Sequence, residues 1–304
     1  VHLLPGSPAR LTLTAAPPTI PVDGHRARVT AVVEDVWGNP VVDGTPLTLT
    51  TTLGSITPTA GTTWAGRLQS LLTSGTQAGT ATATTCAGPL TTTAQVDFLP
   101  LAPYTLTLSA NPPVLLADGT STTTLSIGAS DRFGNPVADG TTVRVLTTMG
   151  LVQPAQVPTT QGRATATLRA STEVGTALVQ ALAGEARTQL GVPFVPGPPH
   201  TVLLTVDPTV LSSSWASAAG IRVHVLDALG RPVVDGTVVT LTTSLGEVTP
   251  QFAPTLDGRI EAILWAGRIP GQAIVRAESG EAWSEVSVSI LCHIPLPLIL
   301  AGSP

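Results

Sequence analysis

The side chains best placed for chemistry lie in a short acidic motif, where Asp35, Asn39 and Asp43 are spaced four residues apart. Their side-chain oxygens could surround a Ca²⁺ ion. They could equally cap turns by accepting hydrogen bonds from backbone N–H groups, while the neighbouring glycines supply positive φ. The spacing is not that of an EF-hand loop, and no acidic cluster supports it. We therefore interpret the motif as a turn and predict no metal site.

Other catalytic or cofactor-binding patterns are missing from the sequence. The histidines are scattered and none has metal-ligand spacing with another. No nucleophile elbow, dinucleotide-binding loop or phosphate-binding loop occurs. All 14 basic residues are arginine, so Schiff-base chemistry and lysine–asparagine crosslinks are excluded. We predict that the protein is not an enzyme and uses no cofactor.

Composition narrows the class of protein further. Of the 304 residues 42% are hydrophobic and 11% charged, which is less than half the usual charged share of about 25% and argues against disorder. A net charge of −5 offers no basic surface for nucleic acid. No apolar run approaches the roughly 20 residues of a membrane-spanning helix. Abundant threonine and valine, punctuated by glycine and proline, favour an all-β fold.

An internal repeat organises the chain. Residues 35–45 read Asp-Val-Trp-Gly-Asn-Pro-Val-Val-Asp-Gly-Thr, and similar segments follow at 131–141 and 227–237, each 96 residues after the last. Two further kinds of pair keep this interval: Leu53-Gly54, Met149-Gly150 and Leu245-Gly246, and Gly66-Arg67, Gly162-Arg163 and Gly258-Arg259. The repeat predicts three similar domains in tandem.

Each copy shows the spacing of short strands and turns that is typical of a sandwich. In the second copy we expect strands over residues 104–109, 120–130, 141–148, 163–170, 176–183 and 186–194. About seven strands in 96 residues fit an immunoglobulin-like β-sandwich. We thus predict three tandem immunoglobulin-like domains in an extended rod.

Proline-rich linkers set the expected boundaries of these domains. The sequence predicts an N-terminal arm, three domains, and an apolar C-terminal tail, at residues 1–8, 9–99, 100–195, 196–291 and 292–304. Short, proline-rich and apolar linkers should be semi-rigid.

The motif Asp-x-x-Gly-Asn-Pro-Val-x-Asp-Gly-Thr, followed by a threonine-rich strand, resembles the group 1 bacterial immunoglobulin-like domains of intimin and invasin. The resemblance covers nearly the whole chain, and it implies fold more than function, because such domains serve as spacers, adhesin tips and polymer modules. The third copy departs from it. Ser214-Trp215 stands where the other copies have Asp-Gly, and Arg231 stands where they have Asn39 and Asn135.

Aromatic and aliphatic side chains at equivalent loop positions are candidates for contacts between domains. Trp37, Phe133 and Leu229 occupy one loop position in the three copies. Each could pack against the neighbouring domain and stiffen the rod, or fold over its own sandwich. Four other tryptophans without aromatic counterparts could serve interfaces, sugar stacking or ordinary core variation: Trp64, Trp215, Trp265 and Trp283.

The chain has only two cysteines, Cys86 and Cys292. Strand alternation turns Cys86 outward, whereas Cys292 lies past the last strand of the third copy. Three domains in line would hold the two thiols tens of ångströms apart, whereas a disulfide needs Cα atoms within about 7 Å. A bond within one chain is therefore not expected. A bond between chains and two free thiols both stay open.

Both ends of the chain resemble its internal linkers, as if further domains adjoined them. An apolar strand in the tail would have unpaired backbone groups and would tend to pair with the edge of a sheet. Donation of this strand to a second copy, fold-back onto the third domain, and a fragment of a longer repeat protein are three hypotheses. The candidate subunit interface consists of Leu3, Leu4, Cys86, Cys292, Ile294, Leu296, Leu298, Ile299 and Leu300.

Our first interpretation is a secreted structural protein, whose partner is itself in a head-to-tail extracellular filament. The alternative is a stalk or tip module of a bacterial surface adhesin, which would bind host or matrix glycans or proteins without polymerising. Both interpretations place the protein outside the cell or at its surface, with no nucleic-acid partner and no membrane span.

Overall fold

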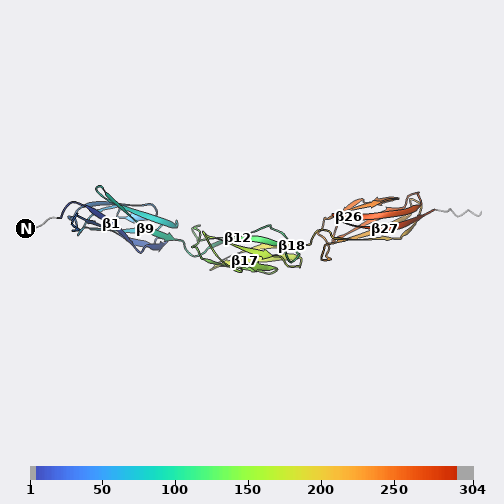
Figure 1. The fold of residues 1–304 in the computed structure, drawn as a ribbon, viewed down its shortest axis with the longest axis horizontal. Helices are drawn as coiled ribbons and strands as arrows, with labels where there is room; N and C mark the ends of the chain where they lie inside the picture. The colour runs from blue at the N-terminus through green and yellow to red at the C-terminus, as the bar shows by residue number, and fades with distance from the viewer. Residues whose placement is uncertain (1–4, 293–304) are drawn as a thin grey trace, which may run out of the picture.

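A computed structural model describes residues 5–292, which form three β-sandwiches joined end to end in an extended rod (Figure 1). We call them domain 1 (β1–β9), domain 2 (β10–β18) and domain 3 (β19–β27). The end of a domain that points toward the N-terminus is its proximal end, and the opposite end is its distal end. The predicted all-β fold with three tandem immunoglobulin-like domains is confirmed.

Each domain packs a four-stranded sheet against a five-stranded sheet. In domain 1 the orders are β1-β3-β7-β5 and β2-β9-β8-β4-β6, and domains 2 and 3 repeat both orders. The pairing is antiparallel except that the second strand of each domain, which is short, runs parallel to the last one, as β2 does beside β9. The described residues form no helix that is long and apolar enough to cross a membrane.

Equivalent strands have the same length in the three domains, except that β11 has two residues where β2 and β20 have three. Domain 1 contains β1 Arg10–Ala16, β2 Thr19–Pro21, β3 Arg26–Glu34, β4 Pro46–Thr51, β5 Ser55–Thr57, β6 Ala60–Thr62, β7 Arg67–Thr73, β8 Gly79–Ala87 and β9 Leu90–Leu99. Domain 2 contains β10 Thr105–Asn111, β11 Leu115–Leu116, β12 Thr122–Ser130, β13 Thr142–Thr147, β14 Leu151–Gln153, β15 Gln156–Pro158, β16 Arg163–Arg169, β17 Gly175–Ala183 and β18 Ala186–Val195. Domain 3 contains β19 Thr201–Asp207, β20 Val210–Ser212, β21 Ala218–Leu226, β22 Val238–Thr243, β23 Glu247–Thr249, β24 Phe252–Pro254, β25 Arg259–Trp265, β26 Gly271–Ser279 and β27 Ala282–Leu291.

The core of each domain consists mainly of alanine, valine and leucine side chains that alternate along the strands with outward-facing residues. In β3, Ala27, Val29, Ala31 and Val33 are all fully buried, while the residues between them face outward. Phe98 and Phe194 close the cores of domains 1 and 2 at equivalent positions, where domain 3 has Ile290. Burial of these faces holds each sandwich together, because both cysteines are free.

Two glycines of the repeat stand where backbones touch. A Cβ on Gly150 would lie 2.3 Å from the carbonyl oxygen of Arg169, and one on Gly162 would lie 2.7 Å from that of Ala129. Both residues also have positive φ, near +70°. The repeated pairs, Leu-Gly or Met-Gly and Gly-Arg, therefore mark contacts that leave no room for a side chain on the glycine.

The six strands predicted for domain 2 are present within a few residues of the expected bounds. The sequence missed three short strands, β11, β14 and β15. Strands of two or three residues show no alternation to detect, and β15 ends in a proline. Each domain therefore has nine strands instead of about seven.

A matched pair of glycine substitutions tests these contacts. Gly134 has positive φ, but a Cβ there would meet nothing within 4 Å. We expect Gly134→Ala to cost domain 2 about 1–2 kcal/mol in stability through φ alone, whereas Gly150→Ala should cost more than about 3 kcal/mol because overpacking is added. Hydrogen exchange by mass spectrometry reports each domain separately. Equal effects of the two substitutions would contradict this account.

Candidate functional site

A buried carboxylate anchors the proximal end of every domain. Asp131 in domain 2 is 1% exposed, and its Oδ1 accepts hydrogen bonds from the backbone N–H groups of Phe133 and Asn135, both at 2.9 Å. Its Oδ2 accepts from the linker N–H of Leu101 at 3.1 Å and from the side chain of Asn135 at 2.9 Å. One side chain thus closes its own turn, fixes the linker and orients Asn135.

Asn135 continues this network into domain 1. Its Oδ1 accepts from the N–H of Ala78 at 2.9 Å, and its Nδ2 donates to the carbonyl of Thr76 at 2.8 Å. Both partners lie in the loop between β7 and β8, at the distal end of domain 1. The carboxamide, with one acceptor and two donors, therefore bridges the two domains directly.

Two more contacts support this joint, which we call joint 1. Arg132 forms an ion pair with Asp23 of domain 1, and its guanidinium lies 4.8 Å from the centre of the Phe133 ring. The linker residue Leu101 packs its side chain against the core of domain 1 while its N–H is held by domain 2. The linker is thus fixed at both ends.

The joint between domains 2 and 3, which we call joint 2, uses the equivalent carboxylate with a different bridging side chain. Asp227 accepts from the backbone of Leu229, Arg231 and Gly197. Arg231 donates to Asp227 through Nε at 3.0 Å and Nη2 at 2.6 Å, and through Nη1 to the carbonyl of Thr172 in domain 2. The arginine noted as a departure from the repeat therefore replaces asparagine as the bridge.

These networks keep the carboxylates ionised. The N–H of Gly6 is the largest influence on Asp35, and with the groups of Asn39 and Trp37 it outweighs burial and lowers the pKa of Asp35 to about 2. Burial alone would raise the pKa of Asp227, but the side chain and backbone of Arg231, Gly197 and Leu229 together lower it to about 2. The pKa of Asp131 is lowered in the same way, against burial. Donors surround these oxygens, which is the turn-capping role expected from the sequence.

The three loop residues predicted to pack between domains lie at the proximal ends. Phe133 is 37% exposed beneath Arg132, Leu229 is 53% exposed, and Trp37 is 82% exposed. Their packing between domains stays a prediction. The polar bridges across the joints come from Asn135, Arg231 and Arg132. These bridging roles were not predicted from the sequence, although the change from asparagine to Arg231 in the third copy was visible there.

Only part of the predicted subunit interface lies within the described residues. Cys86 is half-buried on the outer face of β8, with its Sγ 3.5 Å from the Thr91 hydroxyl, and Cys292 is exposed. Domains 1 and 3, which carry them, lie at opposite ends of the rod (Figure 1). Leu3, Leu4, Ile294, Leu296, Leu298, Ile299 and Leu300 lie outside the described residues.

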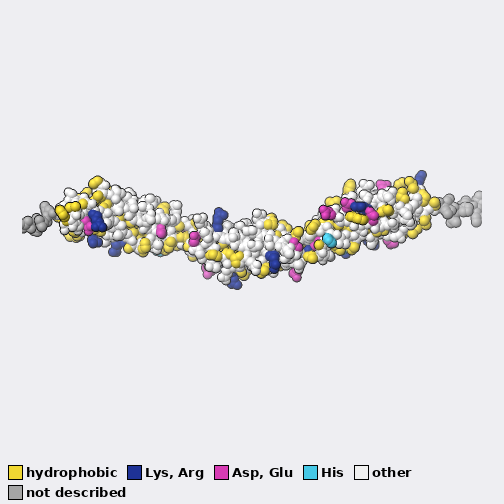
Figure 2. Space-filling view, viewed as in Figure 1, with side chains coloured by type: hydrophobic (Ala, Val, Ile, Leu, Met, Phe, Trp, Pro, Cys, Tyr) yellow, Lys and Arg dark blue, Asp and Glu magenta, His cyan; other side chains and the backbone are white. Residues whose placement is uncertain are grey.

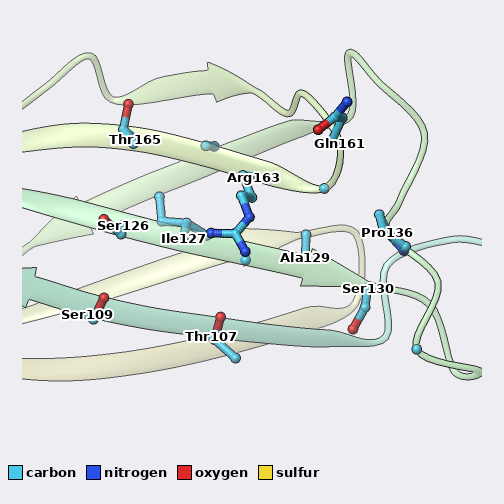
Figure 3. A pocket seen from close by; sticks show the side chains of 14 residues that line it. Thr107, Ser109, Ser126, Ile127, Ala129, Ser130, Pro136, Gln161, Arg163 and Thr165 are labelled. Atoms are coloured by element: carbon cyan, nitrogen blue, oxygen red, sulfur yellow. The ribbon is translucent and has the colours of Figure 1, made fainter.

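The outer face of the four-stranded sheet in domain 2 holds a shallow groove (Figure 3). Hydroxyl groups line it, with Arg163 lying across the strands. Gly128 opens the groove, because a Cβ there would be 2.6 Å from the Thr107 hydroxyl. It contains no carboxylate or histidine, so it offers hydrogen bonds to a surface ligand but no acid–base pair.

Domain 3 has a different outer surface on its five-stranded sheet. Phe252, Thr240, Glu278 and Trp283 form one row across four adjacent strands, because each is the register partner of the next. Phe252 is 67% exposed and Trp283 is 54% exposed. Arg276, in the next row, lies 4.5 Å from the centre of the Trp283 ring and pairs with Glu278 and Glu285. We call this surface, with Ile274, the aromatic face of domain 3.

The aromatic face breaks the repeat. The corresponding row in domain 1 is Ala60, Thr48, Cys86 and Thr91. Figure 2 shows that charged side chains are sparse over most of the visible rod and that acidic and basic ones gather on the visible side of domain 3.

Among the described residues, no three His, Cys, Asp or Glu side chains are grouped to hold a metal ion.

Comparison with known proteins identifies the kind of domain. A family model described as invasin, domain 3 matches residues 7–101 and again 102–197. The chain belongs to this family of bacterial immunoglobulin-like domains. The family places the protein at the bacterial cell surface and is not enzymatic, as the sequence predicted. Comparison with curated protein sequences finds no match.

Solved structures share the fold of this invasin-type chain. Invasin, described as a bacterial integrin-binding protein, is 20% identical with a TM-score of 0.58, and the match covers 93% of this chain and 60% of that one. The Escherichia coli adhesin FdeC is 17% identical with a TM-score of 0.65, covering 95% and 99%. Yersinia pseudotuberculosis InvD is 21% identical with a TM-score of 0.57, covering 91% and 96%.

Substitution of the bridging asparagine tests joint 1. We expect Asn135→Ala to raise the hydrogen-exchange rate of the Ala78 amide at least about tenfold, because its acceptor is removed. Asn39→Ala is the matched control: Asn39 bonds Asp35 just as Asn135 bonds Asp131, but it lies far from Ala78. Unchanged protection of Ala78 in Asn135→Ala, measured by NMR, would rule out the bridge.

The lowered pKa of Asp227 predicts acid sensitivity of domain 3. Because the pKa is about 2 in the folded state and about 3.9 when unfolded, the stabilisation is complete above pH 4–5 and lost as the pH falls toward 2. The full loss should be about 2–3 kcal/mol, because each unit of pKa difference corresponds to about 1.4 kcal/mol. In a Trp37→Phe, Trp64→Phe background, tryptophan fluorescence during urea unfolding follows domain 3 alone. Asp227→Asn should flatten the pH dependence, and an equally steep fall in that variant would contradict the assignment.

Proposed function

We propose that the chain is a stiff section of a bacterial surface adhesin, and that domain 3 supplies a surface for contact with a host protein. The joints support the first part, because each fixes its linker, its own turn and the preceding domain through one buried carboxylate. A rod of three sandwiches held in this way projects what it carries away from the cell.

The observation that carries the proposed contact is the aromatic face of domain 3. Exposed tryptophan together with arginine is the side-chain combination that dominates protein interfaces. Arg276 already pairs with two carboxylates, so a partner would meet apolar area inside a polar rim. Invasin, which shares the fold, is described as integrin-binding, and that description also favours a protein partner.

The head-to-tail filament, our first interpretation of the sequence, has less support. In domain 3, Arg268, Ile269 and Pro270 replace Thr76, Gln77 and Ala78 of the loop that Asn135 grips in domain 1. Pro270 has no N–H to donate, so a second copy could not repeat joint 1 at this end. Strand donation by the tail falls outside the described residues. Deletion of residues 294–304 tests it, since the filament hypothesis requires fibres in the intact chain and none after deletion.

A binding experiment with matched variants tests the proposed contact. The purified chain is coupled to beads, and attachment to cultured mammalian cells is measured before and after protease or glycosidase treatment of the cells. We expect attachment that protease removes and that falls at least tenfold in Trp283→Ala with Phe252→Ala. Trp64→Ala, which removes an exposed tryptophan of domain 1, should leave attachment unchanged.

Two outcomes would overturn the proposal. One is the absence of attachment by the intact chain. The other is attachment that the double variant does not reduce, provided that its melting temperature matches that of the parent. Loss of attachment after glycosidase treatment but not after protease treatment would mean that the partner is a glycan and not a host protein.

A further inference from the structure

The proximal end of domain 1 repeats the arrangement that forms joints 1 and 2. Asp35 is 3% exposed, and its Oδ1 accepts from the N–H groups of Trp37 and Asn39, both at 2.9 Å. Its Oδ2 accepts from Gly6 at 3.0 Å and from Asn39 Nδ2 at 3.2 Å. The turn, the arm and the asparagine are thus held as in domain 2.

In the described part of the chain, no loop lies against Asn39 as the loop between β7 and β8 lies against Asn135. Asn135 uses its Oδ1 and a second N–H on Ala78 and Thr76. Within residues 5–292, the same groups of Asn39 have no protein partner, and its side chain is exposed. Beside it, Val36 and Trp37 present adjoining apolar side chains to solvent. Trp37 is more than twice as exposed as Phe133 at the equivalent position of joint 1.

We propose that this proximal end is a docking surface for the distal end of another immunoglobulin-like domain of the same kind as domain 1. This surface is equivalent to two established interfaces: at joints 1 and 2, the bridging side chain beside the equivalent carboxylate contacts the preceding domain. The hydrogen-bonding groups of Asn39 match a loop that offers a carbonyl and, two residues later, an N–H group.

The residues at this surface also define which domain fits. A loop like that of domain 3 does not, because Pro270 cannot donate the N–H that Asn39 would accept. The occupant is therefore not domain 3 of a second copy. Val36 stands where Arg132 pairs with Asp23 in joint 1, so the occupant needs no acidic residue at that position and gains from an apolar one.

A contact made by so few side chains needs a covalent tether between the two domains, which raises their effective concentration to the millimolar range. The test is a chain extended at its N-terminus, in which residues 1–103 are followed by residues 9–304. The natural linker of joint 1 then precedes the second copy of domain 1. Cys86 and Cys292 become serine. One sample carries spin labels at Thr93→Cys in both copies of domain 1, so that their separation reports the new joint. A second sample carries labels at Thr93→Cys in the second copy and at Gln189→Cys, the equivalent position of domain 2, and reports joint 1.

We expect the distance distribution across the new joint to be as narrow as that across joint 1. Asn39→Ala in the second copy should broaden it at least twofold and leave joint 1 unchanged. Ala78→Pro in the first copy, which imitates Pro270 of domain 3, should broaden it equally. Val36→Arg in the second copy should narrow it again in the Asn39→Ala background, because it restores a partner for Asp23.

A broad distribution with Asn39 intact, beside a narrow one at joint 1, would overturn the proposal. So would a narrow distribution that neither Asn39→Ala nor Ala78→Pro changes, since the joint would then not use these groups. Dimers of the unextended chain that Asn39→Ala abolishes, seen by sedimentation, would overturn the choice of occupant. Hydrogen exchange in each variant verifies that both copies remain folded.

Discussion

The rod depends on one buried, ionised carboxylate in each domain. Asp35, Asp131 and Asp227 each accept four or more hydrogen bonds from donors of their own turn, the linker before it and the side chain four residues on. An ionised group is costly to bury unless donors surround it, so the turn, the linker and the bridging side chain must all be in place together. Local folding of a domain and its orientation to the preceding domain are therefore coupled.

In the proposed function, this coupling is what makes a stiff assembly out of small domains with mainly aliphatic cores. The cores rely on alanine, valine and leucine, and the glycine contacts that bring the backbones close are inside each domain. The cross-joint contacts are few: a carboxamide or guanidinium bridge, one ion pair at joint 1, and a linker leucine packed against the preceding core. Short, proline-rich linkers leave little freedom for these contacts to restrain.

Much of this architecture could be predicted from the sequence. The 96-residue interval fixed the number of domains, and alternation placed the long strands and the outward side of Cys86. The short edge strands could not be found, because two or three residues carry no period. The bridging roles of Asn135 and Arg231 were also missed. An asparagine after a glycine indicates a turn, and only the placement of the preceding loop shows that its carboxamide has a second partner.

The function was harder to predict from the sequence than the fold. The apolar tail suggested a polymer, whereas the family, the proline in the distal loop of domain 3 and the aromatic face favour an adhesin. The repeat itself showed where to look, since side chains that differ among equivalent positions, such as Trp283 beside Thr91, mark surfaces that the fold does not require.

Small-angle X-ray scattering of the intact chain tests the central claim that the carboxylate networks make a stiff rod. At neutral pH the account predicts the scattering of a single extended particle whose maximum dimension and cross-section match the structure in Figure 1. Asp131→Ala, which removes the shared acceptor at joint 1, should shorten the average dimension and broaden its distribution while the three domains remain folded. Scattering of a flexible string of beads from the intact chain, or an unchanged rod in Asp131→Ala, would contradict the account.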